Sequence, residues 1–361
     1  MVALLFPYLI LKTLHWRPIG LGFVYTAAAI GTGICALGIG ILADVWGRKA
    51  TFLMSSLLLP VSILMIVLSS NTWVIFIAAI IGGFSGTGSL AGGGIGGAIQ
   101  PIQSAVVSDI SPSDKRTHTF SLLAFTGGIS AACGMALTRF FSIEHGFMVA
   151  LVFSLLATIP VLGLKLESPR GTLKKIKSKV VIGKFSLTGI FNGMSQGMVN
   201  PFMIPFFVLV YHMPKERMAT WGFVAGVVAA VTLLFAPTLE RRMGFVKTIA
   251  VTRGAGAVLL VLFPFVRVLP FSIFVYLASR ALRVVGVPVQ QTALTDRVQG
   301  DEYGRSLAIN QVARLVASAA GSAMSGLFFN ADILAAPFLI YGAITSFNIG
   351  LYVRFFSNEP K

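Results

Sequence analysis

The strongest constraint on this chain is a succession of apolar runs, each about 20 residues long. A helix needs about 20 apolar residues to cross the roughly 30 Å hydrocarbon core of a bilayer. Hydrophobic residues make up 56% of the sequence and charged residues only 11%, about half the charged fraction of a soluble domain. The runs lack the alternation of barrel strands, so only helices can satisfy their backbones in lipid. The sequence therefore predicts an all-α, polytopic membrane protein.

Eleven runs are long enough to span a membrane. We expect spans at 18–42, 50–69, 73–106, 118–141, 146–164, 186–211, 219–237, 246–268, 270–294, 305–328 and 333–355. The first twelve residues are also apolar, but as a helix they cover only about 18 Å and cannot cross. No small-residue cleavage site follows them, which argues against a signal peptide. We interpret them as part of a truncated first helix in a twelve-helix plan.

Lysine and arginine are distributed unequally between the two sets of loops. One set holds 18 of the 28 basic residues and the other holds six, while four lie inside spans. Because cytoplasmic loops carry an excess of basic residues, we expect the first set and the C-terminus in the cytoplasm, in a plasma or inner membrane. The net charge of +16 follows from these loops and does not indicate nucleic-acid binding.

The chain divides into two related halves. A basic linker at 166–185 separates an N-terminal bundle at 1–165 from a C-terminal bundle at 186–361. Gln100–Asp114 aligns with Val287–Asp301, with Pro, Gln and Asp at matching positions. Internal repeats of this kind are typical of secondary transporters. We therefore expect two six-helix bundles related by a pseudo-twofold axis.

The segment GILADVWGRK, residues 40–49, resembles the signature loop of the major facilitator superfamily, Gly-x-Leu-Ala-Asp-x-x-Gly-Arg-Lys. It lies between the second and third expected helices, as in the family, and Gly47 aligns with Gly244 in the second half. The resemblance implies alternating access, in which the loop acid locks the bundles on the cytoplasmic side. The implied gating residues are Gly40, Asp44, Gly47, Arg48 and Lys49.

The tract Gly82–Gly97 holds nine glycines in sixteen residues. Its spacing is close to a dinucleotide-binding fingerprint, but no soluble α/β unit exists here to support one. Glycine destabilises a helix by about 1 kcal/mol relative to alanine, so we expect a kink or an unwound stretch. Its role is either tight helix packing or a bent segment that lines the transport path.

Polar residues inside the spans mark a candidate substrate cavity. Thr188, Asn192, Gln196 and Asn200 recur every four residues and share one helix face. The resemblance implies that the seventh helix, which carries them, lines the cavity; the alternative is hydrogen bonding between helices as packing. Intramembrane arginines usually face a cavity or a partner. The other candidate cavity residues are Arg280, Arg283, Asn310, Gln311 and Arg314.

The leading hypothesis is a secondary transporter for a small molecule, working as a monomer in the bilayer with or without a coupling proton or ion. The substrate is either an amphipathic compound for efflux or a small anionic or polar metabolite. The alternative is a degenerate, non-transporting relative that acts as a receptor or scaffold, or an inactive fragment. No catalytic or metal-binding constellation is assembled in the sequence, so we expect no enzyme activity, no cofactor and no metal.

Asp44→Asn should weaken closure on the cytoplasmic side and shift the protein towards the inward-facing state, because the locking charge is lost. Accessibility labelling of cysteines placed in the cavity would report the shift. Unchanged labelling from both sides would remove Asp44 from the gate.

Overall fold

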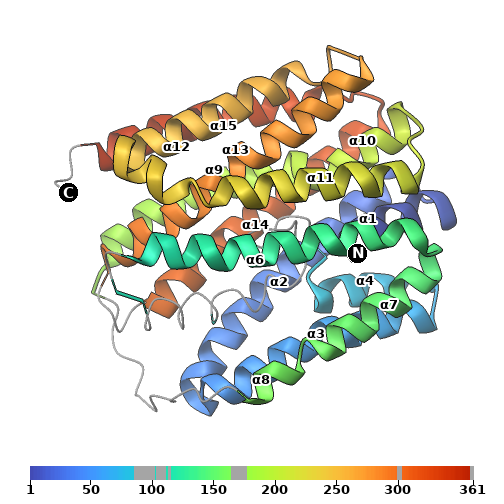
Figure 1. Cartoon of the computed structure of the whole chain (residues 1–361), viewed down its shortest axis with the longest axis horizontal. Coiled ribbons are helices and arrows are strands. Elements are labelled where there is room, and N and C mark those ends of the chain that lie inside the picture. Colours follow the sequence, from blue (N-terminus) through green and yellow to red (C-terminus); the bar gives the residue numbers. More distant parts are fainter. Residues whose placement is uncertain (85–101, 103–110, 113–114, 164–176, 299–302, 358–361) are drawn as a thin grey trace.

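The computed structural model describes residues 1–84, 102, 111–112, 115–163, 177–298 and 303–357. Every regular element in these ranges is a helix, and the long helices run side by side along the length of the molecule (Figure 1). Successive helices turn at alternate ends. We call the end with the turn at Gly47 the Gly47 end, and the end with the turn at Asn71 the Asn71 end.

The first half of the chain supplies the helices of one bundle. They are α1 (Val2–Tyr8) with a π-helical turn (Leu9–Thr13), α2 (Pro18–Trp46), α3 (Arg48–Leu68), α4 (Thr72–Gly82), α6 (Arg116–Leu137) with a 3-10 turn (Thr138–Phe140), α7 (Ile143–Leu156) and α8 (Ile159–Gly163).

The second half supplies the other bundle, and proline stands at the first or second position of several of its helices, where its missing N–H costs nothing. The helices are α9 (Lys179–Val199) with a 3-10 turn (Asn200–Phe202), α10 (Met203–Val210), α11 (Lys215–Leu233), α12 (Ala236–Leu262), α13 (Leu269–Thr295), α14 (Tyr303–Asn330) and α15 (Ala336–Phe356).

Nine helical stretches among the described residues are long and apolar enough to cross a bilayer. Their outer faces carry exposed apolar side chains such as Ile34, Leu68 and Phe140. Apolar surface of this extent is favourable only against lipid. Trp73 is also exposed at the Asn71 end, where tryptophan suits the membrane interface. The prediction of an all-α, polytopic membrane protein is confirmed.

Two helices extend beyond the predicted membrane spans. The helix α9 begins at Lys179, so residues 179–185 of the predicted linker are helical. Within this stretch the ammonium group of Lys184 lies 5.8 Å from the centre of the Phe356 ring, a cation–π contact. Residues 238–245, which separate the predicted spans 219–237 and 246–268, are mostly helical as well, since α12 is broken only at Gly244. Residues 164–176, the rest of the linker, lie outside the described residues.

The predicted span 73–106 is interrupted at the start of the glycine tract. The helix α4 ends at Gly82, and Gly83 has a φ of 64°, in the left-handed region that favours glycine. Gly82 is also a close contact, because a Cβ there would lie 2.6 Å from the Phe84 ring. The break agrees with the expected kink. The remaining glycines of the tract, between 85 and 97, lie outside the described residues.

Two turns at the Gly47 end share one backbone geometry. Gly47 has φ 95° and ψ 154°, and Gly244 has φ 76° and ψ 168°, a region that essentially only glycine adopts. The hydroxyl of Thr51 donates to the Gly47 carbonyl at 3.0 Å, and the hydroxyl of Thr248 donates to the Gly244 carbonyl at 2.8 Å. The sequence alignment of Gly47 with Gly244 therefore corresponds to a structural repeat.

The two halves meet along two helix pairs. Helices α9 and α10 together form one membrane span. Counted as spans, α2 is the second of the first half and packs on α14, the fifth of the second half. In the same way α6, the fifth span of the first half, packs on α11, the second of the second half. This exchange is what a twofold axis between the bundles produces. Contact is close, because a Cβ on Gly22 would lie 2.7 Å from the Cα of Gly326.

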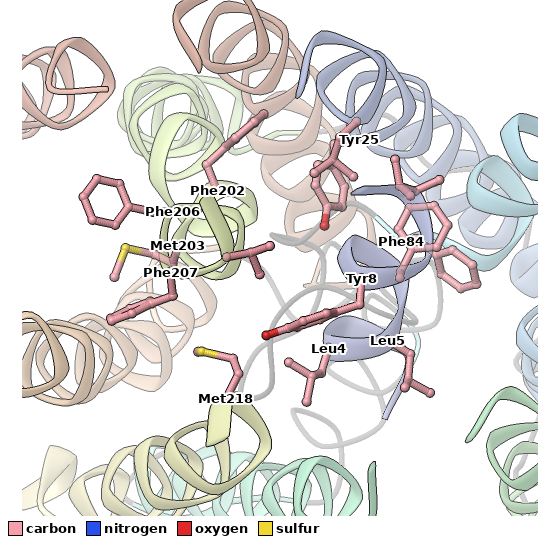
Figure 2. Close-up of a cluster of buried hydrophobic side chains, with 14 of the residues drawn as sticks. Leu4, Leu5, Tyr8, Tyr25, Phe84, Phe202, Met203, Phe206, Phe207 and Met218 are labelled. Atoms are coloured by element: carbon pink, nitrogen blue, oxygen red, sulfur yellow. The ribbon is translucent and has the colours of Figure 1, made fainter. Parts of the chain in front are cut away.

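An aromatic cluster fills the space between the bundles towards the Asn71 end (Figure 2). Phe6 of α1 packs on Phe84 with ring centres 5.2 Å apart. Tyr25 of α2 and Phe202 after α9 bring rings from both halves within 6.2 Å. Phe6 is 1% exposed, and most residues of α1 are buried between the bundles. As predicted, α1 and its π-helical turn are too short to cross a bilayer.

The helix α14 also packs closely on α9 through glycines. A Cβ on Gly193 would overlap the carbonyl group of Arg314 and lie 2.8 Å from its Cα, and a Cβ on Gly197 would meet Ser318 in the same way. The Ser322 hydroxyl donates to the Gly197 carbonyl at 3.2 Å. Small residues let helix backbones approach in this manner.

Gly193→Ala should destabilise the protein by about 1–2 kcal/mol, because overpacking outweighs the gain in helix propensity. Gly183→Ala is the matched control on the same helix, since no atom lies within 4 Å of a Cβ there. It should be neutral or stabilising. Thermal unfolding in detergent would measure both, and equal effects of the two variants would contradict the packing role.

Candidate functional site

The polar face of α9 is paired along its length. The Thr188 hydroxyl donates to the Phe185 carbonyl at 3.0 Å, and the Gln196 amide donates to the Asn192 side chain at 3.1 Å. Thr188 and Asn192 are buried, whereas Gln196 and Asn200 are half-buried. The adjacent glycine face, not this polar face, carries the contact with α14. The polar side chains of α9 are therefore not covered by this contact with α14.

Arg283 connects this polar face to α13. Its Nη1 donates to the Asn200 side chain, and its Nε donates to the Ser279 carbonyl of its own helix at 3.1 Å. The Tyr341 hydroxyl of α15 also hydrogen-bonds the Arg283 side chain. The contact joins Arg283 to Asn200, the last residue of the predicted polar face. The predicted cavity position of Arg280 and Arg283 stays a prediction. One guanidinium thus links three helices near the middle of the bundle.

Arg280 lies one turn from Arg283 on the same helix. Its Nη1 is 3.4 Å from the hydroxyl of Tyr276, a long hydrogen bond. Arg280 and Arg283 repel each other electrostatically. Two half-buried cations in this position favour an anionic group nearby.

The three candidate cavity residues on α14 make different contacts. The Asn310 amide donates to the Phe185 carbonyl at 2.7 Å and so fastens α14 to α9. Arg314 donates from Nη2 to the Gln311 side chain at 2.7 Å. Asn310 is therefore a packing contact, while Gln311 and Arg314 form a pair within one helix.

Carboxylates are missing from the helices around this site. The sequence has no Asp or Glu at 179–210, 245–295, 303–331 or 336–357. Guanidinium groups in these helices can be neutralised only by a neighbouring segment or a ligand. No group of three metal-binding side chains occurs among the described residues.

The signature loop is described in part. Gly47 forms the turn between α2 and α3, Arg48 is half-buried and Lys49 is exposed. The side chain of Asp44 and the surroundings of Gly40 lie outside the described residues. The structure therefore describes the turn at Gly47, whereas the gating role of the loop and of the Asp44 charge stays a prediction.

Three residues near the arginines were not among the sequence candidates. Tyr276 stands four residues before Arg280, a spacing that could have indicated their contact. Tyr341 lies on another helix, and nothing in the sequence pairs it with Arg283. Arg253 is an intramembrane arginine that its position towards a helix end made less conspicuous, yet it is 4% exposed.

Comparison with known proteins adds the family. The sequence matches the family model of the Major Facilitator Superfamily over residues 1–321. The chain belongs to this superfamily. The all-α fold of two bundles and the sequence resemblance at residues 40–49 are thereby confirmed.

Two solved structures of superfamily transporters are similar to this chain. The human organic anion transporter MFSD10 (TETRAN) has a TM-score of 0.74 and 14% identity, covering 92% of this chain and 83% of its own. The nucleoside transporter NupG, as a variant, has a TM-score of 0.71 and 13% identity, covering 98% and 95%. At these identities the likeness shows the fold alone. No curated protein matched the sequence.

Arg283→Gln should abolish substrate transport while leaving folding intact, because the amide keeps hydrogen bonding but loses the charge. Arg283→Lys should rescue only partly, since the planar fork is lost. Arg354→Gln, at an exposed helix end, is the charge-matched control. Uptake into proteoliposomes would measure all three, and wild-type transport by Arg283→Gln would show that the charge is structural.

Proposed function

We propose that this membrane protein is a secondary transporter that moves a small anionic or polar solute by alternating access, without covalent chemistry. The observation that carries the proposal is the Arg283–Asn200 contact, which puts a cation against a polar helix face in helices without carboxylates. An anionic group of a solute would replace the missing counter-charge. The similar structures, an organic anion transporter and a nucleoside transporter by name, are consistent with such solutes.

The orientation supports the same proposal. Basic residues gather in the loops of the Gly47 end, which we place in the cytoplasm. The aromatic cluster joins the bundles towards the Asn71 end, which we place outside. We therefore assign the structure to a state closed on the outside. Efflux of amphipathic compounds finds less support, because the described aromatic rings pack against each other in this closure.

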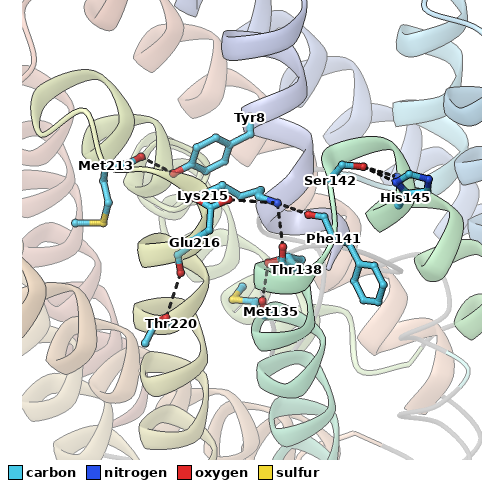
Figure 3. A network of polar contacts seen from close by, with 10 residues as sticks. All are labelled: Tyr8, Met135, Thr138, Phe141, Ser142, His145, Met213, Lys215, Glu216 and Thr220. Carbon is cyan, nitrogen blue, oxygen red and sulfur yellow. Dashed lines mark hydrogen bonds and ion pairs between the residues drawn. The ribbon is translucent and has the colours of Figure 1, made fainter.

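Lys215 reinforces the closure as a bridge between the bundles (Figure 3). From the start of α11, its Nζ donates to the Thr138 carbonyl at 3.1 Å and to the Phe141 carbonyl, both at the end of α6 and its 3-10 turn. A cation there is favourable because helix C-termini carry partial negative charge. The Tyr8 hydroxyl adds a second link, donating to the Met213 carbonyl at 2.8 Å. An outward-open state must break both contacts.

Substrate identification begins with a thermal-shift screen of organic anions, nucleosides and polyols on the purified protein. Ligands that stabilise it are then tested for counterflow in proteoliposomes. Counterflow of a stabilising ligand supports a transporter. Stabilisation without counterflow would indicate a non-transporting receptor instead.

Lys215→Met should shift the population towards the outward-open state, because the apolar stem remains but the bond to the α6 carbonyls is lost. Spin labels on the outer ends of α6 and α11 should show a longer distance. Arg217→Met removes an exposed charge two residues away and should leave the distance unchanged. If Lys215→Met also leaves it unchanged, the bridge does not hold the gate.

A further inference from the structure

Arg253 lies inside the second bundle, away from the Arg283–Asn200 contact. It is 4% exposed, whereas the other three intramembrane arginines are half-buried. Its Nη2 donates to the side chain of Gln290, on α13, at 2.7 Å. Gln290 stands seven residues beyond Arg283, or about 10 Å along the helix. The two arginines therefore occupy separate levels of the bundle.

The Arg253 guanidinium is held between two other helices. Its Cζ lies 5.2 Å from the centre of the Tyr352 ring of α15, a cation–π contact. On the other side Gly286 of α13 leaves room, because a Cβ there would lie 3.6 Å from Nε. The group is thus fixed in place by packing, and its position is set before any ligand binds.

Several polar atoms around this guanidinium are buried without a hydrogen-bond partner among the described residues. They include the Nη1 of Arg253 and the hydroxyl of Tyr352. On the same face of α15, about one and two turns before Tyr352, the side-chain oxygens of Asn348 and Thr345 are also unpaired. Buried polar atoms are normally paired, so this group of atoms is incomplete as it stands.

The described helices around Arg253 supply no carboxylate for its charge. The helices α13, α14 and α15, and α12 beyond Gly244, contain no Asp or Glu. Arg314 of α14 lies close enough to add electrostatic repulsion. A buried cation with only an amide oxygen and a ring as neighbours is stabilised strongly by a counter-ion.

We propose that Arg253 Nη1 and the Tyr352 hydroxyl bind a small monovalent inorganic anion of the chloride class within the second bundle. Both groups can donate hydrogen bonds to one anion. The site lies inside one bundle rather than between the two, so the ion is a resident ligand and not the transported solute. Its charge lowers the electrostatic cost of the arginines on the neighbouring helices α13 and α14.

The test compares thermal unfolding of the purified protein in sodium chloride and in sodium gluconate at equal ionic strength. Chloride should raise the unfolding temperature in proportion to the logarithm of its concentration once that exceeds the dissociation constant, by about 3 °C or more at a hundredfold excess. Arg253→Gln should remove the chloride-dependent part of the shift. Tyr352→Phe, which keeps the ring and loses only the hydroxyl, should weaken apparent chloride affinity about tenfold. Arg354→Gln on the same helix should respond like the wild type.

Bromide provides a direct second measurement, because its anomalous scattering in crystals should give a peak beside Arg253. The proposal is overturned by the absence of a chloride-specific shift in the wild type, which would leave buried water as the partner. It is also overturned if the chloride-dependent rise in unfolding temperature persists in both Arg253→Gln and Tyr352→Phe. The same holds if Arg283→Gln removes that rise while Arg253→Gln does not. If Arg253→Gln does not fold, the proposal is tested by the chloride affinity of Tyr352→Phe and by the presence or absence of the bromide peak.

Discussion

The structure depends on backbone contact along α14. This helix lies between α9 of its own bundle and α2 of the other, and glycines on both sides remove the Cβ atoms that would keep the backbones apart. Lipid offers apolar side chains no advantage in associating with each other, so close packing and hydrogen bonds must hold membrane helices together. Serine and threonine hydroxyls bonded to carbonyls across the same contacts, such as Thr26 to Ala319, add to this.

Such packing determines where polar chemistry can be placed. The glycine face of α9 is occupied by α14, and Asn200, at the end of the adjacent polar face, contacts the arginine of α13. The polar side chains are then held by neighbours within the second bundle, and their positions are fixed relative to one another. The described part of the first bundle has no comparable polar cluster.

The sequence was sufficient for the fold class because the length and hydrophobicity of each apolar run predict a membrane-spanning helix without reference to the rest of the chain. Helical spacing also grouped Asn200 with Thr188, Asn192 and Gln196, and Asn200 is the member of that group that contacts Arg283. The sequence failed where contacts join distant segments. The pairing of Arg283 with Tyr341 and of Arg253 with Tyr352 depends on how α13, α12 and α15 pack, which no local pattern encodes. The helices α9 and α12 begin at Lys179 and Ala236, outside the apolar runs, because backbone hydrogen bonding continues where the apolar pattern that marks a span has ended.

The paired turns at Gly47 and Gly244 separate two roles within one motif. Both halves keep the glycine, its unusual backbone and the threonine four residues later, but the charges around the turns differ, since Ala43-Asp44 is matched by Glu240-Arg241. The backbone geometry of this turn is thus common to both halves, whereas the acid at position 44 has a basic counterpart in the second half. Duplicated halves of one chain can therefore keep the same turn while the charges beside it diverge.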